Sequence, residues 1–243
     1  MATVLILGAA SDMAIATAEK FASQGFHIQL AARNIHRLHP LQSDLAIKYN
    51  SRVSVHEFDA LDFESHRQFF AGLNPKPEIT ICVFGYLGDN EKAASDWTET
   101  SKILHTNFTG AVSILNVVAQ HYISVKEGVI AGIASVAGER GRQSNYMYGS
   151  AKAGFIAYLS GLRNRLYREG VHVATVQPGF VFTKMTEDLA LPKMLTATPA
   201  EVAEVVYTAV QKRKNIVYVK WFWKWIMLII KLIPEFIFKR MKL

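Results

Sequence analysis

The chain alternates between short apolar runs and longer stretches in which apolar residues recur at helical spacing. The short runs are rich in β-branched side chains and end at glycine, proline or polar residues, a pattern that predicts strands. They lie at residues 3–7, 27–31, 53–58, 79–85, 128–135, 171–177 and 215–219. The stretches between them predict helices at residues 14–24, 36–49, 62–72, 99–122, 146–168 and 199–213.

Regular alternation of strands and helices is typical of α/β proteins whose parallel strands carry helices on both faces. The pattern runs without a linker, a repeat or a low-complexity segment as far as residue 219. We therefore predict a single Rossmann-like, doubly wound domain over residues 1–219, with a seven-stranded parallel sheet. Residues 220–243 would form an apolar C-terminal helical extension.

Composition changes this picture in two ways. Cys82 is the one cysteine, which excludes an intramolecular disulfide and fits a reducing compartment. The opening "MATVLILG" has no positive leader, so it is interpreted as a buried strand and not as a signal peptide.

The positive charge is concentrated at the C-terminus. Nine of the 27 Lys and Arg residues fall in the last 32 positions, beside one acid, Glu235. These cations lie among Trp, Ile and Leu and not among polar residues, which disfavours a nucleic-acid interface and favours an apolar, charged surface.

The turn after the first predicted strand has part of a dinucleotide-binding pattern. Gly8 leaves the strand just before a helix, where backbone N–H groups and the helix dipole favour a phosphate. Asp12 and Ala14 occupy the places of the other two glycines, so a plain tight turn explains Gly8 equally well. Asp12 would repel a pyrophosphate unless its side chain caps the helix.

Arg33 follows the second predicted strand, where NAD-binding proteins place an acid for the ribose hydroxyls. A guanidinium there suits the additional 2′-phosphate of NADP(H), so NAD(H) is the weaker alternative. An exposed loop arginine would also explain this residue.

The sequence "SVAGERGRQSNYMYGSAKAGF" contains the strongest chemical signal. Tyr148 and Lys152 are four residues apart and share one face of a helix, and Ser135 ends a strand thirteen residues before Tyr148. A surface Tyr and Lys would explain the pair alone. With the first turn and "VQPGFVFT" in the same order, however, roughly residues 3–219 resemble the short-chain dehydrogenase/reductase family.

The resemblance implies a carbonyl-reducing or alcohol-oxidising enzyme. Ser135 would hydrogen-bond the substrate oxygen and Tyr148 would exchange its proton, while Lys152 would lower the pKa of Tyr148 and hold the nicotinamide ribose. Asn107 would position a water in a proton relay; a buried polar helix residue is the other interpretation of it.

The resemblance also implies the cofactor contacts, homodimers or homotetramers, and no metal. The implied contacts with NADP(H) are Gly8, Ser11, Asp12, Met13, Arg33, Asp59, Ala60, Gly85, Tyr148, Lys152, Pro178, Gly179, Val181 and Thr183.

The end of the fourth predicted strand departs from the family. Most members have "NNAG" there, whereas this chain has "VFGYLGD". This sequence resembles, more loosely, the subgroup that includes decaprenylphosphoryl-2-keto-pentose reductases, which act on a keto-sugar held on a polyprenyl phosphate. A ketone of a steroid or a fatty acyl chain is an alternative substrate, and a non-catalytic NADP(H) sensor or scaffold is an alternative function.

The tail "KWFWKWIMLIIKLIPEFIFKRMKL" combines apolar residues with charges that recur on one side of a helix: Lys220, Lys224, Lys231, Glu235, Lys239 and Lys242. Such a stripe opposite Trp and Ile predicts a helix lying on a membrane surface. Internal charges and Pro234 argue against a span and predict two helical pieces. A lid over the substrate or a dimer interface are the alternatives; with the membrane interpretation, we expect a cytoplasmic protein, peripheral at the inner face of a membrane.

Overall fold

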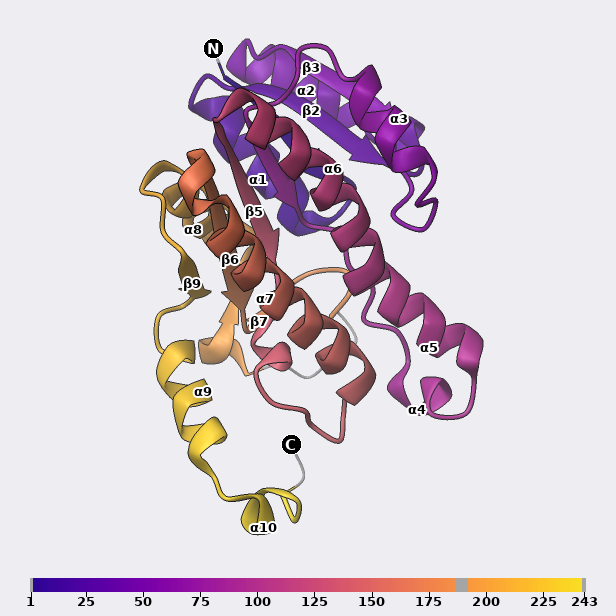
Figure 1. The fold of residues 1–243 in the computed structure, drawn as a ribbon, viewed down its shortest axis with the longest axis vertical. Coiled ribbons are helices and arrows are strands. Elements are labelled where there is room, and N and C mark those ends of the chain that lie inside the picture. The colour runs from indigo at the N-terminus through magenta and orange to yellow at the C-terminus, as the bar shows by residue number, and fades with distance from the viewer. Residues whose placement is uncertain (1, 187–191, 242–243) are drawn as a thin grey trace.

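The computed structural model describes residues 2–186 and 192–241, and Figure 1 shows a twisted sheet enclosed between two layers of helices. All seven strands of this sheet run parallel, in the order β3-β2-β1-β4-β5-β6-β9. Their bounds are Thr3–Leu7 (β1), His27–Ala32 (β2), Val53–Glu57 (β3), Ile79–Cys82 (β4), Gly128–Ile133 (β5), Val171–Pro178 (β6) and Ile216–Val219 (β9). The predicted α/β fold and its seven-stranded sheet are confirmed.

Each face of the sheet carries its own apolar core. Val4 and Ile6 of β1 point into one core, and Leu5 and Leu7 point into the other, because successive side chains of a strand alternate between faces. A strand buried on both faces must be apolar at every position, which is why the strands appear in the sequence as continuous apolar runs.

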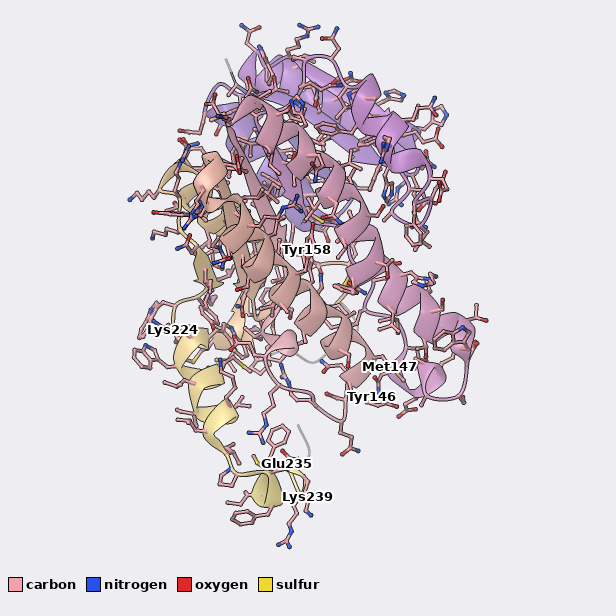
Figure 2. All side chains as sticks on the ribbon, viewed as in Figure 1. Tyr146, Met147, Tyr158, Lys224, Glu235 and Lys239 are labelled. Carbon is pink, nitrogen blue, oxygen red and sulfur yellow. The ribbon has the colours of Figure 1, made fainter. Side chains whose placement is uncertain are left out.

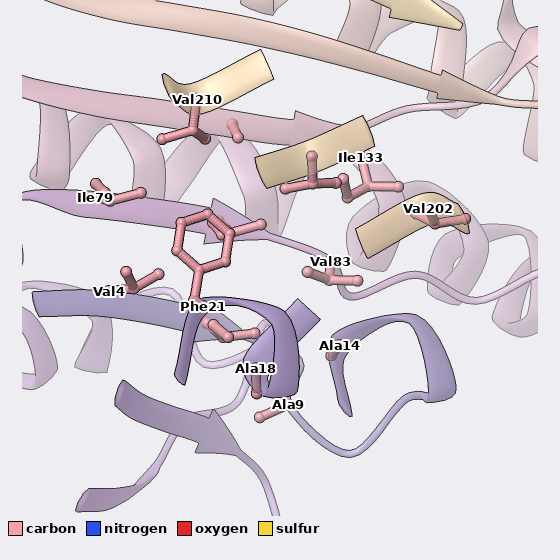
Figure 3. Packing of buried hydrophobic residues seen from close by; sticks show 14 of the residues in the cluster. Val4, Ala9, Ala14, Ala18, Phe21, Ile79, Val83, Ile133, Val202 and Val210 are labelled. Carbon is pink, nitrogen blue, oxygen red and sulfur yellow. The ribbon is translucent and has the colours of Figure 1, made fainter. Parts of the chain in front are cut away.

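Helices α1 (Asp12–Ser23), α2 (His39–Tyr49) and α8 (Pro199–Gln211) contribute to the first core, where Phe21 is fully buried (Figure 3). Helices α3 (Ser65–Gly72), α6 (Gly110–Val125) and α7 (Tyr146–Leu166) contribute to the second. Pro199 and Glu201 begin α8 as predicted, since Thr198 and Glu201 form a reciprocal capping box.

The helix predicted at residues 99–122 is longer and less regular than expected. It comprises α5 (Trp97–Leu104), a π-helical turn (His105–Thr109) and α6. Among the described residues, this stretch is the one helix long and apolar enough, by length and composition, to cross a membrane. Ile114, Leu115 and Val118 are nevertheless fully buried in the second core, so the stretch serves as a core helix here.

Three short elements were not predicted. Helix α4 (Asn90–Ala93) follows the β4 loop, and β7 (Phe180–Val181) pairs with β8 (Thr196–Ala197) beyond the carboxyl end of β6. Elements of two to four residues contain too few side chains to show a periodicity in the sequence.

The tail forms two helices, α9 (Trp223–Leu232) and α10 (Glu235–Phe238), as predicted from Pro234. The inner face of α9 buries Trp223 and Met227 against Val136, with partly buried neighbours that include Phe180 and Tyr218. The tail therefore packs onto the domain, below the carboxyl ends of β6 and β9 in Figure 1.

Candidate active site

A cavity of about 520 Å³ lies at the carboxyl ends of the strands, where the connections from the neighbouring strands β1 and β4 lead in opposite directions. We call it the cofactor cavity. Most of its lining comes from the ends of the first four strands and the segments that follow them, and the rest from α5 and the π-helical turn. The lining residues are Gly8, Ala10, Ser11, Ala32, Arg33, Asn34, Arg37, Phe58, Asp59, Ala60, Leu61, Phe84, Gly85, Tyr86, Lys102 and Thr106. Six of the predicted cofactor contacts lie on it, namely Gly8, Ser11, Arg33, Asp59, Ala60 and Gly85.

The turn at Gly8 requires glycine. Its φ of +89° is in the left-handed region, and a Cβ there would lie 2.7 Å from the backbone of Phe84. Next to it, the Ser11 hydroxyl caps α1 by accepting a hydrogen bond from Ala14 N. The turn thus presents bare backbone and a helix N-terminus to the cavity, a geometry that fits a dinucleotide phosphate.

Asp12 does not have the expected capping role. Ser11 provides the cap, and Asp12 Oδ2 instead accepts a hydrogen bond from Lys184 N at 2.7 Å. Asp12 is not among the residues that line the cofactor cavity, and its carboxylate holds the loop after β7. Because the Asp12 carboxylate does not line the cofactor cavity, we do not expect it to repel a pyrophosphate bound there.

Guanidinium groups line the cavity beyond β2. Arg33 and Arg37 are both exposed, and neither forms an ion pair with any residue that the structure describes. Two cations without an acidic partner fit the 2′-phosphate of NADP(H). The sequence analysis missed Arg37, although it follows Arg33 by four residues in "ARNIHR".

The unusual loop after β4 is held by two buried side chains. Asn107, in the π-helical turn, donates to Tyr86 O at 2.6 Å and accepts from Tyr86 N at 3.2 Å. Glu99 accepts from the Tyr86 hydroxyl at 2.8 Å and from Asp89 N at 3.0 Å, and these hydrogen bonds lower the pKa of Glu99. These contacts give "FGYLGD" a fixed shape without the family's asparagine amides.

Lys152 lies behind this loop, 3% exposed, with Nζ donating to Ile133 O at 3.1 Å. A Cβ on Gly85 would lie 3.6 Å from this Nζ and 3.0 Å from Asn107 Oδ1, so the three predicted residues meet at one point. Burial lowers the pKa of Lys152 to about 8, which leaves the ammonium protonated at neutral pH.

Tyr148 and Ser135 both line a second cavity. Burial raises the pKa of Tyr148 to about 12, and the Ser135 side chain opposes this rise. Lys152, whose ammonium lies 5.7 Å from the ring centre, is not among the groups that lower the pKa of Tyr148 in the chain itself. The phenol is therefore protonated at neutral pH.

The second cavity, of about 760 Å³, we call the substrate cavity. Four predicted loop residues and Met13 line it, the loop residues being Pro178, Gly179, Val181 and Thr183. Leu87, Val136, Phe180 and Met185 make its walls largely apolar.

Trp223 of the tail closes one side of the substrate cavity. Its Nε1 donates to Leu195 O at 3.1 Å, and its ring covers Gly179 so closely that a Cβ there would lie 2.0 Å away. The tail therefore reaches the substrate cavity. The contact between Trp223 and Gly179 could not be predicted from a local sequence pattern, because it joins segments far apart in the chain.

Three of the six charges of the predicted tail stripe are paired with the body of the protein. Lys220 pairs with Glu201, Lys231 with Glu139, and Glu235 with Arg140 at 3.0 Å. Lys224 on α9 and Lys239, just after α10, point outward, as Figure 2 shows, and Lys242 lies outside the described residues. The membrane interpretation of the stripe stays a prediction.

Arg140 fastens the end of α9. Its guanidinium donates to Ile230 O and to Ile233 O and stacks 3.6 Å from the centre of the Phe238 ring. These contacts satisfy carbonyls that a helix C-terminus leaves without intrahelical partners. The loop between Ser135 and Tyr148 thus carries the residue that holds the tail.

Residues 2–193 match the family model described as short chain dehydrogenase. An uncharacterised oxidoreductase of Mycobacterium tuberculosis is 34% identical over 245 residues, which cover 99% of this chain and 97% of that protein. An uncharacterised oxidoreductase of Streptomyces coelicolor is 30% identical, covering 98% and 95%. A solved short-chain dehydrogenase from Sphingobium yanoikuyae in complex with NADPH shares the fold, with a TM-score of 0.83, 21% identity and 97% of each chain covered.

Proposed function

The chain belongs to the short-chain dehydrogenase/reductase family, and from this premise we propose that it reduces a ketone of an amphiphilic, membrane-held substrate with NADPH. One observation carries the proposal: Ser135 and Tyr148 line the same, largely apolar substrate cavity, and Lys152 is buried close to both Tyr148 and Gly85 of the cofactor cavity. A sensor or scaffold would need no such pair, which disfavours the non-catalytic alternative.

The proposed chemistry divides between these residues. NADPH, when bound, supplies the hydride to the carbonyl carbon. Tyr148 donates its proton to the carbonyl oxygen, Ser135 donates a hydrogen bond to the same oxygen, and the Lys152 ammonium stabilises the tyrosinate that forms. A phenol is protonated at neutral pH, which is the state that this proton transfer requires. Asn107 holds the loop beside Lys152, where the water relay expected from the family would pass.

The choice of NADP(H) rests on the cationic end of the cofactor cavity. Arg33 and Arg37 would bind the 2′-phosphate, while Asp59 and Ala60 would border the adenine and the Gly8 turn would hold the pyrophosphate. The Sphingobium structure contains NADPH, which supports the same choice.

The substrate class follows from the walls of the substrate cavity and from the tail. Apolar residues line most of the cavity, and the loose resemblance of "FGYLGD" favours a keto-sugar linked to a polyprenyl phosphate. A steroid or fatty-acyl ketone is the second candidate, since it requires the same apolar walls.

Membrane association is supported by the outer face of the tail. Large apolar side chains stand exposed there beside Lys224 and Lys239, namely Trp221, Trp225, Leu228, Ile229, Leu232 and Phe236. Exposed apolar patches mark interaction surfaces, and cations at their edge favour anionic lipid. The homodimer or homotetramer implied by the family stays a prediction.

Flotation with phosphatidylglycerol vesicles tests this face. The wild-type protein should float at low salt, and the double variant Trp225→Glu, Ile229→Glu should remain in the bottom fraction. Ile47→Glu is the matched control, because Ile47 is 86% exposed on α2 at another site. Equal flotation of all three proteins, or of none, would contradict the membrane proposal.

The catalytic proposal is tested with Tyr148→Phe. Removal of one hydroxyl should reduce ketone turnover with NADPH by roughly 1,000-fold, since general acids contribute about 10² to 10⁴. NADPH affinity, measured by tryptophan fluorescence, should remain within about threefold. Turnover close to wild type would show that Tyr148 is not the proton donor.

A further inference from the structure

Arg142 lines the substrate cavity and has no counter-ion among the described residues. It lies in the loop between Ser135 and α7, and its Nε is shielded from solvent without a hydrogen-bond acceptor. Among residues 2–186 and 192–241 no carboxylate forms an ion pair with it, and burial lowers its pKa. A shielded Nε–H group without an acceptor is costly, so a native fold rarely keeps one without a use.

The acids near the cavity do not serve as its partner. Asp89 Oδ1 accepts hydrogen bonds from Glu91 N and Lys92 N, and so caps α4. Glu91 is exposed, and no cationic side chain among the described residues lies within ion-pair distance of it. Glu139 and Glu235 are engaged by Lys231 and Arg140 on the tail side.

A second unpaired group lies in the same turn. Asn145 N donates to Arg142 O at 3.2 Å, and this turn leads directly into α7, which carries Tyr148. Asn145 Oδ1 is buried on the substrate cavity and has no donor among the described residues. The cavity therefore offers an unused cationic donor and an unused neutral acceptor, one turn before the catalytic tyrosine.

From this arrangement we infer that Arg142 binds an anionic group of the substrate, a phosphate or a carboxylate, while the ketone lies at Tyr148. Asn145 Oδ1 accepts a hydrogen bond from a substrate hydroxyl, and the apolar chain lies along Phe180 and Trp223. The inference rests on the proposed ketone reduction and narrows its substrate to anionic amphiphiles. A neutral steroid would leave the guanidinium unpaired.

Matched substrates test the inference by turnover. The substrates are twelve-carbon chains that carry a ketone at successive positions and end in a phosphate, a carboxylate, a methyl ester or a free alcohol. The turnover of each is measured with NADPH. The wild-type enzyme should prefer an anionic form over its neutral partner by about 10- to 100-fold in kcat/KM, because a charge-assisted hydrogen bond is made. The phosphate and carboxylate arms show which anion is preferred.

In Arg142→Leu that preference should disappear, and in Arg142→Lys it should return in part. Arg168→Leu is the matched control, since Arg168 is exposed and lies away from the substrate cavity. Equal use of charged and neutral ketones by the wild-type enzyme, or an unchanged preference in Arg142→Leu, would overturn the inference.

A binding measurement separates this inference from the catalytic proposal. Dodecyl phosphate, dodecanoate and dodecanol would be titrated into the full-length protein with NADP⁺, with tryptophan fluorescence as the readout, because Trp223 borders the cavity. The anions should bind at least tenfold more tightly than dodecanol, and Arg142→Leu should abolish the difference. If no ketone is reduced but this result holds, only the catalytic proposal fails; equal affinities overturn the anion site.

Discussion

The cofactor cavity and the substrate cavity lie on either side of Lys152, yet they are built in different ways. The cofactor cavity uses mainly residues at or just after the ends of β1, β2, β3 and β4, so most of its contacts depend on the segment that begins where a strand ends. The substrate cavity brings together the β4 loop, the segment before α7, the loop after β6 and a tryptophan from the tail. A cavity made from strand ends inherits the rigidity of the sheet, whereas one closed by a tail depends on how the tail is held.

The difference extends to the kind of contact. At the cofactor cavity, Gly8 meets backbone atoms of Phe84, which have little freedom to move. At the substrate cavity, Gly179 meets the side chain of Trp223, which belongs to a helix held by side-chain contacts. The contact between Gly8 and Phe84 is part of the sheet structure. The contact between Gly179 and Trp223 can be lost while the sheet stays folded.

The largest contrast is expected between Gly8→Ala and Gly179→Ala. Gly8→Ala combines an unfavourable φ with a clash against backbone, so it should lower the free energy of unfolding by about 2 kcal/mol or more. Gly179→Ala should displace Trp223 and shift its fluorescence, with a smaller loss of stability. Chemical denaturation and emission spectra measure both effects. Equal destabilisation would contradict the distinction between the two cavities.

The next effect concerns the cationic end of the cofactor cavity. Arg33→Ala combined with Arg37→Ala should reduce the preference for NADPH over NADH by roughly 10- to 100-fold, because two charge-assisted contacts with the 2′-phosphate are lost. The KM for the ketone should hardly change, since neither residue lines the substrate cavity. Steady-state kinetics with both cofactors measure this. An unchanged preference would show that the phosphate is bound elsewhere.

The smallest effect is expected from Arg140→Ala, which removes the hydrogen bonds to Ile233 O and Glu235. Loosening the tail should raise the KM for the ketone by about three- to tenfold, as an ordering contact near the cavity is lost. NADPH affinity should stay the same, and Arg168→Ala serves as the control. A matching loss of NADPH affinity would mean that the two cavities do not respond separately.

The sequence was most informative where function depends on spacing along one element. Tyr148 and Lys152 share a helix face, and Gly8 and Arg33 follow strands, so their positions could be predicted from the pattern. Asp12 was misjudged because its partner, Lys184 N, is 172 residues away. The burial that raises the pKa of Tyr148 in the chain itself could not be predicted, because the sequence does not specify burial for one side chain.

The sequence by itself determined the alternating strands and helices, the parallel doubly wound sheet and the Ser135–Tyr148–Lys152 set, because each depends on local periodicity and order. Only the tertiary structure decided that Trp223 closes the substrate cavity and that the tail's charges pair with the body. Only the structure showed that Arg142 Nε is buried there without a hydrogen-bond partner among the described residues. Whether a charge is paired or a cavity is closed depends on residues distant in the chain, and packing alone brings them together.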